Sequence, residues 1–326
     1  MDRICYKIII LFAFAICTLN TLNAQDSRID SQDLRQYENI KLDSRESSTK
    51  SSFESNAKSN RKNGFVGRIG ISADYLYHRA DSSQNSSNIS GVIMSIQGAL
   101  GWNWRDYAKA EVGLLLGAGP TDIKGAYPIG AEQIGAQPLS NFSFKGGIAL
   151  NFAFEAKGGY NISSAFKAWD NAFFINAGVE VAILSHFATY TPYSTQLGFL
   201  NLFVEIEGRS ALTQKWAVDY FVRGFGGASL IGIGGEDLQT SESEIFSQTS
   251  LWGVKIGIGT SYKISDKAFV FVRLVSAYYN SGAGQNKRIS IKQNPSLNGL
   301  NAGAGANFKY PKSHLFYGGV QFGVGI

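Results

Sequence analysis

The amino-acid sequence predicts an all-β protein, a closed antiparallel transmembrane β-barrel. Three observations predict it: long runs in which apolar and polar residues alternate, charges confined to one face of these runs, and aromatic residues near their ends. Alternation with a period of two is typical of a strand, because successive side chains point to opposite faces of a sheet. With 44% hydrophobic and 17% charged residues, the composition excludes a largely disordered chain.

Residues 1–24 have the composition of a cleavable signal peptide. Arg3 and Lys7 form a basic beginning, residues 8–16 are apolar, and Ala24 places a small residue before the expected cut. The apolar run is too short to span a bilayer. We therefore expect the chain to be exported.

Both cysteines, Cys5 and Cys17, lie in the predicted signal peptide, so the mature chain would have no disulfide or thiol chemistry. Lipid attachment at Cys17 is the alternative, and the bulky Ile16 before it argues against this. Removal of residues 1–24 takes away two basic residues and one acidic residue, which leaves 28 basic and 24 acidic residues and a net charge of +4. This excess is too small to predict a nucleic-acid partner.

Residues 25–63 are rich in serine, asparagine, glutamine and charge, with eight basic and seven acidic residues. Such a segment buries too little apolar surface to offset the entropy of ordering. We expect a disordered periplasmic N-terminal arm. A plug or a docking segment with a short helix near residues 33–42 is the alternative.

Residues 64–326 form the predicted transmembrane barrel, in which eleven alternating runs stand out. All but one of these runs have 11 to 15 residues, which suits a tilted strand that crosses about 25 Å of hydrocarbon better than the usual soluble strand of about five or six residues. The runs cover residues 65–77, 94–104, 108–116, 142–155, 172–184, 196–208, 216–230, 250–264, 268–279, 298–310 and 315–326.

The charges of these runs all lie opposite the more apolar face, which we take as the outside of the barrel. A Lys or Arg that faces lipid at mid-depth costs about 2–4 kcal/mol, so several misplaced charges would prevent folding. The charged side chains are therefore expected to line the lumen. The candidate lumen-lining residues are Arg68, Asp74, Lys109, Glu111, Lys145, Glu155, Glu180, Glu205, Asp219, Arg223, Lys255 and Arg273.

A secreted β-sandwich is the competing fold, because its strands also alternate. Aromatic residues near the run ends, such as Tyr75 and Trp252 at one rim and Trp102 and Trp216 at the other, favour the barrel. Rings with a polar edge prefer the level of the lipid headgroups. A closed barrel also satisfies its backbone in lipid without disulfides or protected edges.

Eleven runs conflict with the even strand number that bacterial single-chain barrels normally have. The short alternating segment Arg288–Lys292 completes twelve strands, which we expect, with ten as the alternative. Short periplasmic connections then fall at residues 105–106, 157–171, 209–215, 265–267 and 294–297. The longer outside loops fall at residues 79–89, 119–140, 185–195 and 232–249.

The final run resembles the C-terminal strand of bacterial outer-membrane β-barrel proteins, in which alternate apolar residues end on an aromatic residue. Phe322, Val324 and Ile326 match this assembly signal, and Ile326 departs from the usual terminal Phe. The resemblance implies a Gram-negative outer membrane, with its lipid and lipopolysaccharide and the barrel-assembly machinery as partners. In architecture the chain is broadly similar to the small porin-like and surface-antigen barrels, without a motif that names a subfamily.

Enzymes occur among such barrels, so we considered the histidines. His78 and Asp74 share one face near a strand end and form the one pair placed where an acid/base site could lie. A histidine without a catalytic partner is the simpler interpretation. No nucleophile elbow, metal-ligand cluster or phosphate loop is present in the sequence, so we expect neither an enzyme nor a cofactor. A rim hydrolase ranks third among the functions considered.

The lumen charges leave two leading functions open. A slight basic excess along an aqueous path would give a narrow porin-like channel for small solutes, weakly selective for anions. Opposite charges paired across a lumen that phenylalanines partly fill would give a non-conducting surface adhesin or structural barrel. The sequence favours the channel by a small margin.

Overall fold

The structure is a computed structural model that describes residues 64–81, 86–104, 107–125, 142–162, 172–188, 194–234, 244–265, 267–290 and 305–326. The predicted signal peptide (residues 1–24) and N-terminal arm (residues 25–63) lie outside these ranges. Within them, no helix is both long and apolar enough to cross a membrane.

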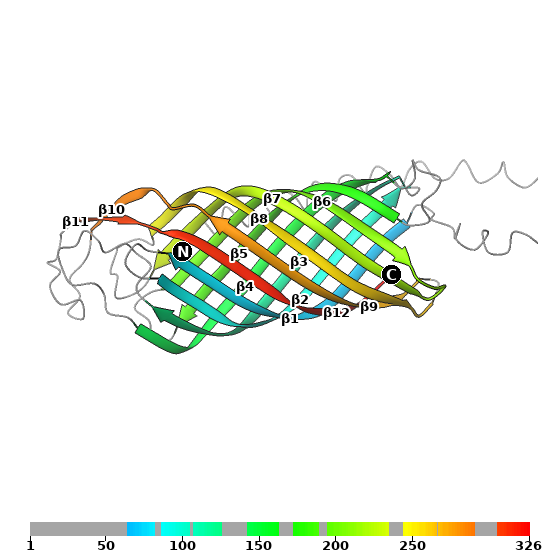
Figure 1. Cartoon of the computed structure of the whole chain (residues 1–326), viewed down its shortest axis with the longest axis horizontal. Coiled ribbons are helices and arrows are strands. Elements are labelled where there is room, and N and C mark those ends of the chain that lie inside the picture. The colour runs from blue at the N-terminus through cyan, green and yellow to red at the C-terminus, as the bar shows by residue number, and fades with distance from the viewer. Residues whose placement is uncertain are drawn as a thin grey trace, which may run out of the picture. The chain divides into compact units, whose positions relative to one another are not determined.

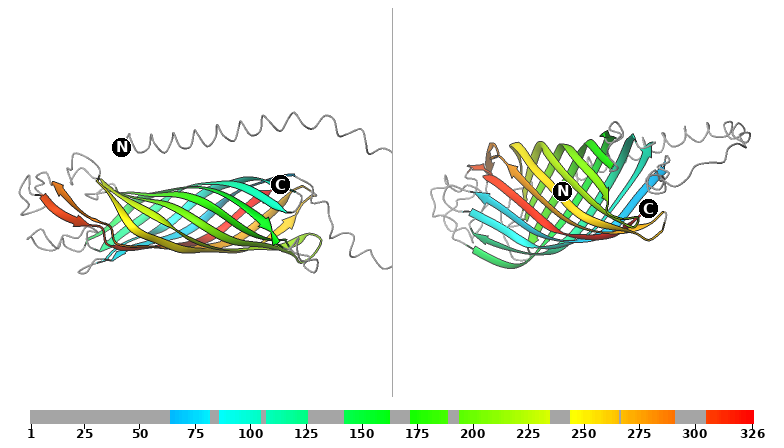
Figure 2. Two further views of the ribbon diagram at one scale, coloured as in Figure 1. Left: turned by 90° about the horizontal axis from the view of Figure 1, so that it is seen from above. Right: turned by 45° about the vertical axis from the view of Figure 1, so that its right-hand side comes forward.

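Ten long antiparallel strands close into one barrel in the order β1-β12-β9-β8-β7-β6-β5-β4-β3-β2 (Figure 1). The strands are strongly tilted against the barrel axis (Figure 2). They are β1 (Gly64–Asp81), β2 (Ser86–Trp104), β3 (Ala108–Gly125), β4 (Phe142–Asn161), β5 (Ala172–Ala188), β6 (Ser194–Ala211), β7 (Trp216–Gly234), β8 (Glu244–Lys263), β9 (Phe269–Ser281) and β12 (Lys312–Gly325).

The first and last strands of the barrel, β1 and β12, close the sheet. Their register runs from Arg68 opposite Gly325 to Asp81 opposite Lys312. Next to the pair Arg68 and Gly325, the backbones of Gly67 and Ile326 exchange two hydrogen bonds of 2.8 and 3.1 Å. Closure leaves no strand edge unpaired, which is the condition for a sheet surrounded by lipid.

The expected twelve strands are wrong, and the alternative of ten is correct. The segment around Arg288 forms β10 (Asn286–Ser290), which pairs with β11 (Gly305–Lys309) in a separate two-stranded sheet. β11 lies within the predicted run 298–310. Neither this run nor the segment 288–292 therefore contributes a strand to the barrel. β10 and β11 have five residues each, and about nine to eleven are needed to cross the hydrocarbon. β9 instead pairs directly with β12.

The connections divide the barrel into two ends. The first end, which we call the short-turn end, carries Gly64, Ile326 and the connections at residues 105–107, 162–171, 212–215 and 264–268. At the opposite end, the long-connection end, the chain leaves the barrel at Asp81, Gly125, Ala188, Gly234 and Ser281 and returns to it at Ser86, Phe142, Ser194, Glu244 and Lys312. The β10-β11 hairpin extends from this end (Figure 1).

An apolar outer surface surrounds the barrel. Large apolar side chains point outward and are exposed on this surface, for example Ile69 (58%), Ile96 (62%), Leu202 (69%) and Leu274 (57%). At the short-turn end, exposed aromatic side chains follow this band: Trp102, Trp104, Tyr107, Tyr160 and Trp216. Apolar side chains bordered by aromatic rings match the surface that hydrocarbon and headgroups favour.

The strands continue past the apolar band at the long-connection end, where the predicted loops 79–89 and 119–140 are partly strand. Here the alternation inverts: Ala80 and Ile123 point inward and are buried, while Arg79 and Lys124 point outward and are exposed. An apolar inside and a polar outside are typical of a barrel wall in water. The rule that the more apolar face is the outside therefore fails in this part of β1 and β3.

Candidate functional site

The lumen contains two layers of different chemistry. The layer toward the short-turn end, which we call the ionic layer, is a contiguous network of five basic and five acidic side chains. Its members are Arg68, Lys109, Lys157, Arg223, Lys255, Glu111, Glu155, Glu180, Glu205 and Glu207. They come from β1 and β3–β8, so the network spans the lumen from wall to wall.

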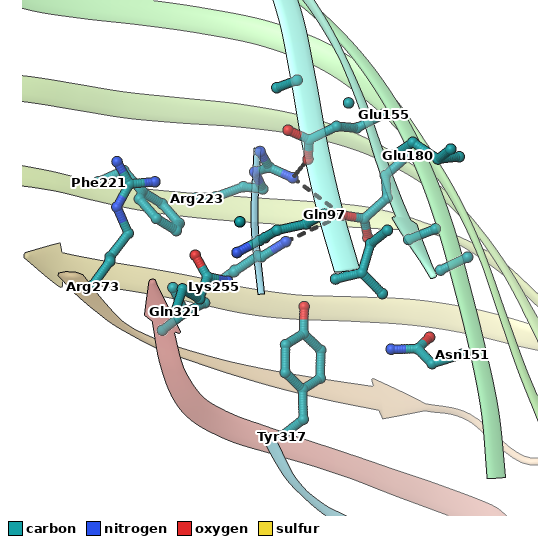
Figure 3. A pocket seen from close by; sticks show the side chains of 18 of the residues that line it. Gln97, Asn151, Glu155, Glu180, Phe221, Arg223, Lys255, Arg273, Tyr317 and Gln321 are labelled. Atoms are coloured by element: carbon teal, nitrogen blue, oxygen red, sulfur yellow. Dashed lines mark hydrogen bonds and ion pairs between the residues drawn. The ribbon is translucent and has the colours of Figure 1, made fainter. Parts of the chain in front are cut away.

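Arg223 on β7 is the centre of the ionic layer, and it contacts carboxylates from three strands, of which Glu155 and Glu180 are labelled in Figure 3. Its Nε donates to Glu205 Oε2 at 2.8 Å, and its Nη1 donates to Glu155 at 2.8 Å and to Glu180 at 3.2 Å. The guanidinium also lies 3.8 Å from the centroid of the Phe203 ring. Only arginine has enough donors in a rigid plane to serve three acids at once.

Lys157 on β4 is a second centre, closer to the short-turn end. Its Nζ donates to Glu205 at 2.7 Å and to Glu207 at 2.9 Å, and it lies 3.5 Å from Glu111. Lys109 and Arg68 complete the layer with contacts of 2.5 Å to Glu207 and Glu111 respectively. Each charge of the ionic layer thus has a partner, as burial in a low-dielectric interior requires.

Neutral polar groups occupy the remaining acceptors of the acids. The Asn176 amide donates to Glu205 and Glu207 at 3.1 Å each, and the Asn201 amide donates to Glu180 at 3.0 Å. The Tyr279 hydroxyl also donates to Glu180 at 3.1 Å. A network with this many fixed donors holds its side chains in one arrangement.

The layer toward the long-connection end is mainly apolar, with buried polar side chains such as His78, Thr121, His186, Ser229 and Gln248 among its apolar ones. Its buried apolar side chains pack into one cluster across the lumen, and Phe199 and Phe225 lie against the Tyr279 ring at centroid distances of 5.2 and 4.6 Å. We call this cluster the apolar layer. It consists of Leu76, Ala80, Ile89, Ile93, Ile123, Ala149, Ala182, Leu184, Leu197, Phe199, Phe203, Phe225, Ile231, Leu251, Ala277, Tyr279, Tyr310 and Leu315.

A cavity of about 110 Å³ lies where the two layers meet. Glu155, Arg223 and Lys255 line it from the ionic layer, and Leu184 and Phe199 line it from the apolar layer. A water molecule needs roughly 10–15 Å³ on this measure, so the cavity holds several waters or one small solute. Its lining continues through the ionic layer to Arg68, Glu207 and Arg273.

The structure brings eight of the twelve candidate lumen residues into the ionic layer. Of the others, Asp219 lies 3.5 Å from Arg209 near the short-turn end, and Asp74 accepts a 2.6 Å hydrogen bond from Ser72. Arg273 lines the cavity. The side chain of Lys145 lies outside the described part of the structure. The eight are Arg68, Lys109, Glu111, Glu155, Glu180, Glu205, Arg223 and Lys255.

The pair His78 and Asp74 shares no hydrogen bond among the described residues. His78 is buried in the apolar layer between Leu76 and Ala80, and its Nε2 has no partner in the described part of the chain. Nor do the described residues contain a group of three or more metal-ligating side chains.

A polar cluster on the outer surface joins three strands at the long-connection end. The Tyr278 hydroxyl lies 2.6 Å from His314 Nδ1, and His314 Nε2 lies 3.3 Å from Asp81. Arg79 Nε donates to the same aspartate at 2.5 Å. The cluster links β9, β12 and β1 across the closing seam.

Lys157 and Glu207 also lie in the ionic layer, on the inward face where the placement of the charges predicts them. Asn176 and Asn201 are site residues that sequence reasoning missed, although each lies four residues from an inward-facing glutamate on the same strand. The predicted assembly residues Phe322, Val324 and Ile326 alternate on the outer face and are 49–59% exposed: 49%, 50% and 59%.

No protein-family model matches the chain, and no curated protein sequence matches it either. Solved structures do. The outer membrane protease OmpT from Escherichia coli superimposes with a TM-score of 0.55 at 9% identity, over 82% of this chain and 99% of that one. The autotransporter translocator domain of NalP from Neisseria meningitidis (TM-score 0.30, 12% identity, 81% and 90% coverage) and OprG from Pseudomonas aeruginosa (0.28, 9%, 81% and 96%) match more distantly.

At such identities the likeness concerns the fold and not the activity. It agrees with the ten-stranded closure, the lipid-compatible outer surface and the polar lumen found here. The chain therefore has the fold of the bacterial outer-membrane β-barrels, and the comparisons assign it to no subfamily of them.

Proposed function

We propose that the chain is a surface protein of the outer membrane, a barrel whose lumen is closed and whose working part is the long-connection end. The apolar layer is the observation that carries the proposal. Apolar side chains that pack across a lumen leave no hydrated path for ions. The barrel would then act as a rigid support for the segments that it displays to the exterior.

The inverted alternation at the long-connection end supports this role. The polar outward residues and the buried inward residues there suit a wall that stands in water beyond the headgroups. Short turns of bacterial barrels face the periplasm and long connections face the exterior. This orientation makes the β10-β11 hairpin and the segment 126–141 surface features of the cell.

Export, localisation and assembly follow the same proposal. Residues 1–24 would direct export to the periplasm, and residues 25–63 would remain there as an arm. The barrel-assembly machinery would insert the barrel into an outer leaflet of lipopolysaccharide, guided by Phe322, Val324 and Ile326. A catalytic role is not part of the proposal.

The narrow anion-favouring channel that the sequence favours is the second candidate. The cavity between the layers supports it, since it already provides a hydrated chamber inside the barrel. For the chamber to conduct, both layers would have to open.

Conductance separates the two candidates. We expect the refolded full-length protein to insert into planar lipid bilayers without discrete current steps. The measurement is made in about 1 M potassium chloride, where the Debye length is about 3 Å. Steady, ion-selective steps from protein that is folded by its gel mobility would favour the channel instead.

Epitope insertion tests the surface role. A tag within residues 235–243 should bind antibody on intact cells, and the same tag within the turn 212–215 should bind only after the outer membrane is permeabilised. Equal labelling of both tags on intact cells would contradict the proposed orientation.

A further inference from the structure

Arg273 on β9 forms no ion pair with any residue that the structure describes, unlike the lumen cations Arg68, Lys109, Lys157, Arg209, Arg223 and Lys255. Its guanidinium lies over two aromatic rings, 5.6 Å from the Phe221 centroid and 5.8 Å from the Phe271 centroid. Such contacts attract a cation but leave its charge unneutralised. Arg273 therefore brings an uncompensated positive charge into the barrel.

The neighbouring strands explain why no carboxylate reaches Arg273. On β8 the residue opposite is Gly259, and on β12 it is Gln321. The next inward positions on β12 are Gly319 and Gly323, which also carry no side chain. Glycine at these positions supplies no counter-charge, and the Phe271 ring occupies the space beside Gly323.

The nearest acids by register form no ion pair with Arg273. Asp219 lies in the same row, one strand beyond Gly259, and pairs with Arg209 at 3.5 Å. Asp74 on β1 accepts the hydroxyl of Ser72 at 2.6 Å through one carboxylate oxygen, and its other oxygen has no hydrogen-bond partner among the described residues. The carboxylates of the ionic layer already serve its own five cations.

The lumen as a whole also carries an excess of positive charge. Among the described inward side chains, the basic residues outnumber the acidic ones by one. The basic residues are Arg68, Lys109, Lys157, Arg209, Arg223, Lys255, Lys263 and Arg273, and the acidic residues are Asp74, Glu111, Glu155, Glu180, Glu205, Glu207 and Asp219.

Two further donors face the cavity that Arg273 lines. The amide nitrogen Nε2 of Gln97 is buried and has no acceptor among the described residues, and a buried donor without a partner costs about 1–3 kcal/mol. Lys255 Nζ lies 3.6 Å from Glu180, which is too far for a hydrogen bond. Figure 3 shows Arg273, Gln97, Gln321 and Lys255 around the same space.

We propose that this cavity binds a small monovalent anion, held by the Arg273 guanidinium and the Gln97 amide with Lys255 nearby. One negative charge neutralises the single excess cation, whereas a dianion would leave a new uncompensated charge beside Glu155 and Glu180. The volume of about 110 Å³ admits a halide or the carboxylate of a short organic acid. The inference goes beyond the surface role and does not depend on whether the barrel conducts.

Crystals of the full-length protein soaked in sodium bromide test the site directly. We expect an anomalous difference peak within hydrogen-bond distance of the Arg273 guanidinium, and none at that place in crystals of Arg273→Gln. A cavity without bromide in the unchanged protein overturns the proposal. Acetate added to the soak distinguishes the two sources: loss of the bromide peak extends the site to carboxylates, and its persistence restricts the site to halides.

Thermal unfolding in detergent provides the solution measurement. Bromide or acetate should raise the midpoint above its value in sulfate of equal ionic strength, and Arg273→Gln should abolish the difference. Arg209→Gln, which removes a lumen cation that has a partner, is the matched control and should retain it. Arg273→Lys keeps the charge and should retain part of the difference, and heat-modified gel mobility verifies that each variant is folded. Equal midpoints in all anions for the unchanged protein contradict the proposal.

Discussion

The two layers of the lumen fill the same barrel by opposite means. In the ionic layer, ten charged groups satisfy one another, so the removal of one partner leaves another charge buried and unpaired. In the apolar layer, side chains are held by dispersion and by exclusion from water, so a truncation leaves an empty volume. One set of strands can thus enclose both a charged layer and a packed apolar layer, one above the other along the barrel axis.

The largest effect should come from the centre of the ionic layer. Arg223→Leu leaves Glu155, Glu180 and Glu205 without their shared partner, and we expect the free energy of unfolding to fall by about 3–5 kcal/mol. Denaturant unfolding in lipid vesicles, followed by tryptophan fluorescence, measures it. Adding Glu205→Gln should recover part of the loss; further destabilisation in the double variant would show that the acids do not depend on Arg223.

The apolar layer is tested by two leucines on β6. Leu197 is 4% exposed and points inward, whereas Leu202 is 69% exposed and points outward. Leu197→Ala should lower the stability by about 2–5 kcal/mol, because a cavity remains in a packed layer. Leu202→Ala should cost less, since lipid fills the space. Equal losses in the same vesicle unfolding assay would mean that the layer is loosely packed.

Phe203 connects the layers, because its ring belongs to the apolar cluster and supports the Arg223 guanidinium. Phe203→Leu keeps most of the volume but removes the cation–π contact, and we expect a loss of about 1–2 kcal/mol. A double-mutant cycle with Arg223→Leu measures the coupling. Additive losses would show that the two layers are energetically independent.

The smallest effect should come from outside both layers. Tyr278→Phe removes the hydrogen bond to His314 in the partly exposed outer cluster, and we expect a loss of about 1 kcal/mol or less. Refolding yield and unfolding midpoint should remain close to those of the unchanged protein. A loss as large as that of Leu197→Ala would mean that this cluster secures the closing seam.

Each of the ten barrel strands corresponds to a predicted alternating run, and the inward placement of the charges could also be predicted, since a charge in lipid is costly and a strand has a period of two. The strand number failed at residues 288–292 and 298–310, because alternation alone does not say which partner a strand finds. Their length is the physical signal, since β10 and β11 are too short to cross the hydrocarbon.

The apolar layer could not be predicted by the same rule. Leu76 and Leu184 lie on the face that carries charges elsewhere on their strands, so a face assigned by its charges hides them. Pairing across the lumen depends on the register of strands distant in sequence, which a single sequence does not reveal. The contacts of Arg223 with β4, β5 and β6 are examples of such pairing across the lumen.

The seam between β1 and β12 has a consequence for the order of folding. The strand that closes the barrel is the last one in the described sequence, and its partner is the first, so the contact of highest sequence separation completes the sheet. Until then β1 and β9 each expose a row of unpaired backbone groups, which are templates for aggregation. Any truncation before Lys312 should therefore yield a chain that reaches the membrane but never becomes resistant to proteases.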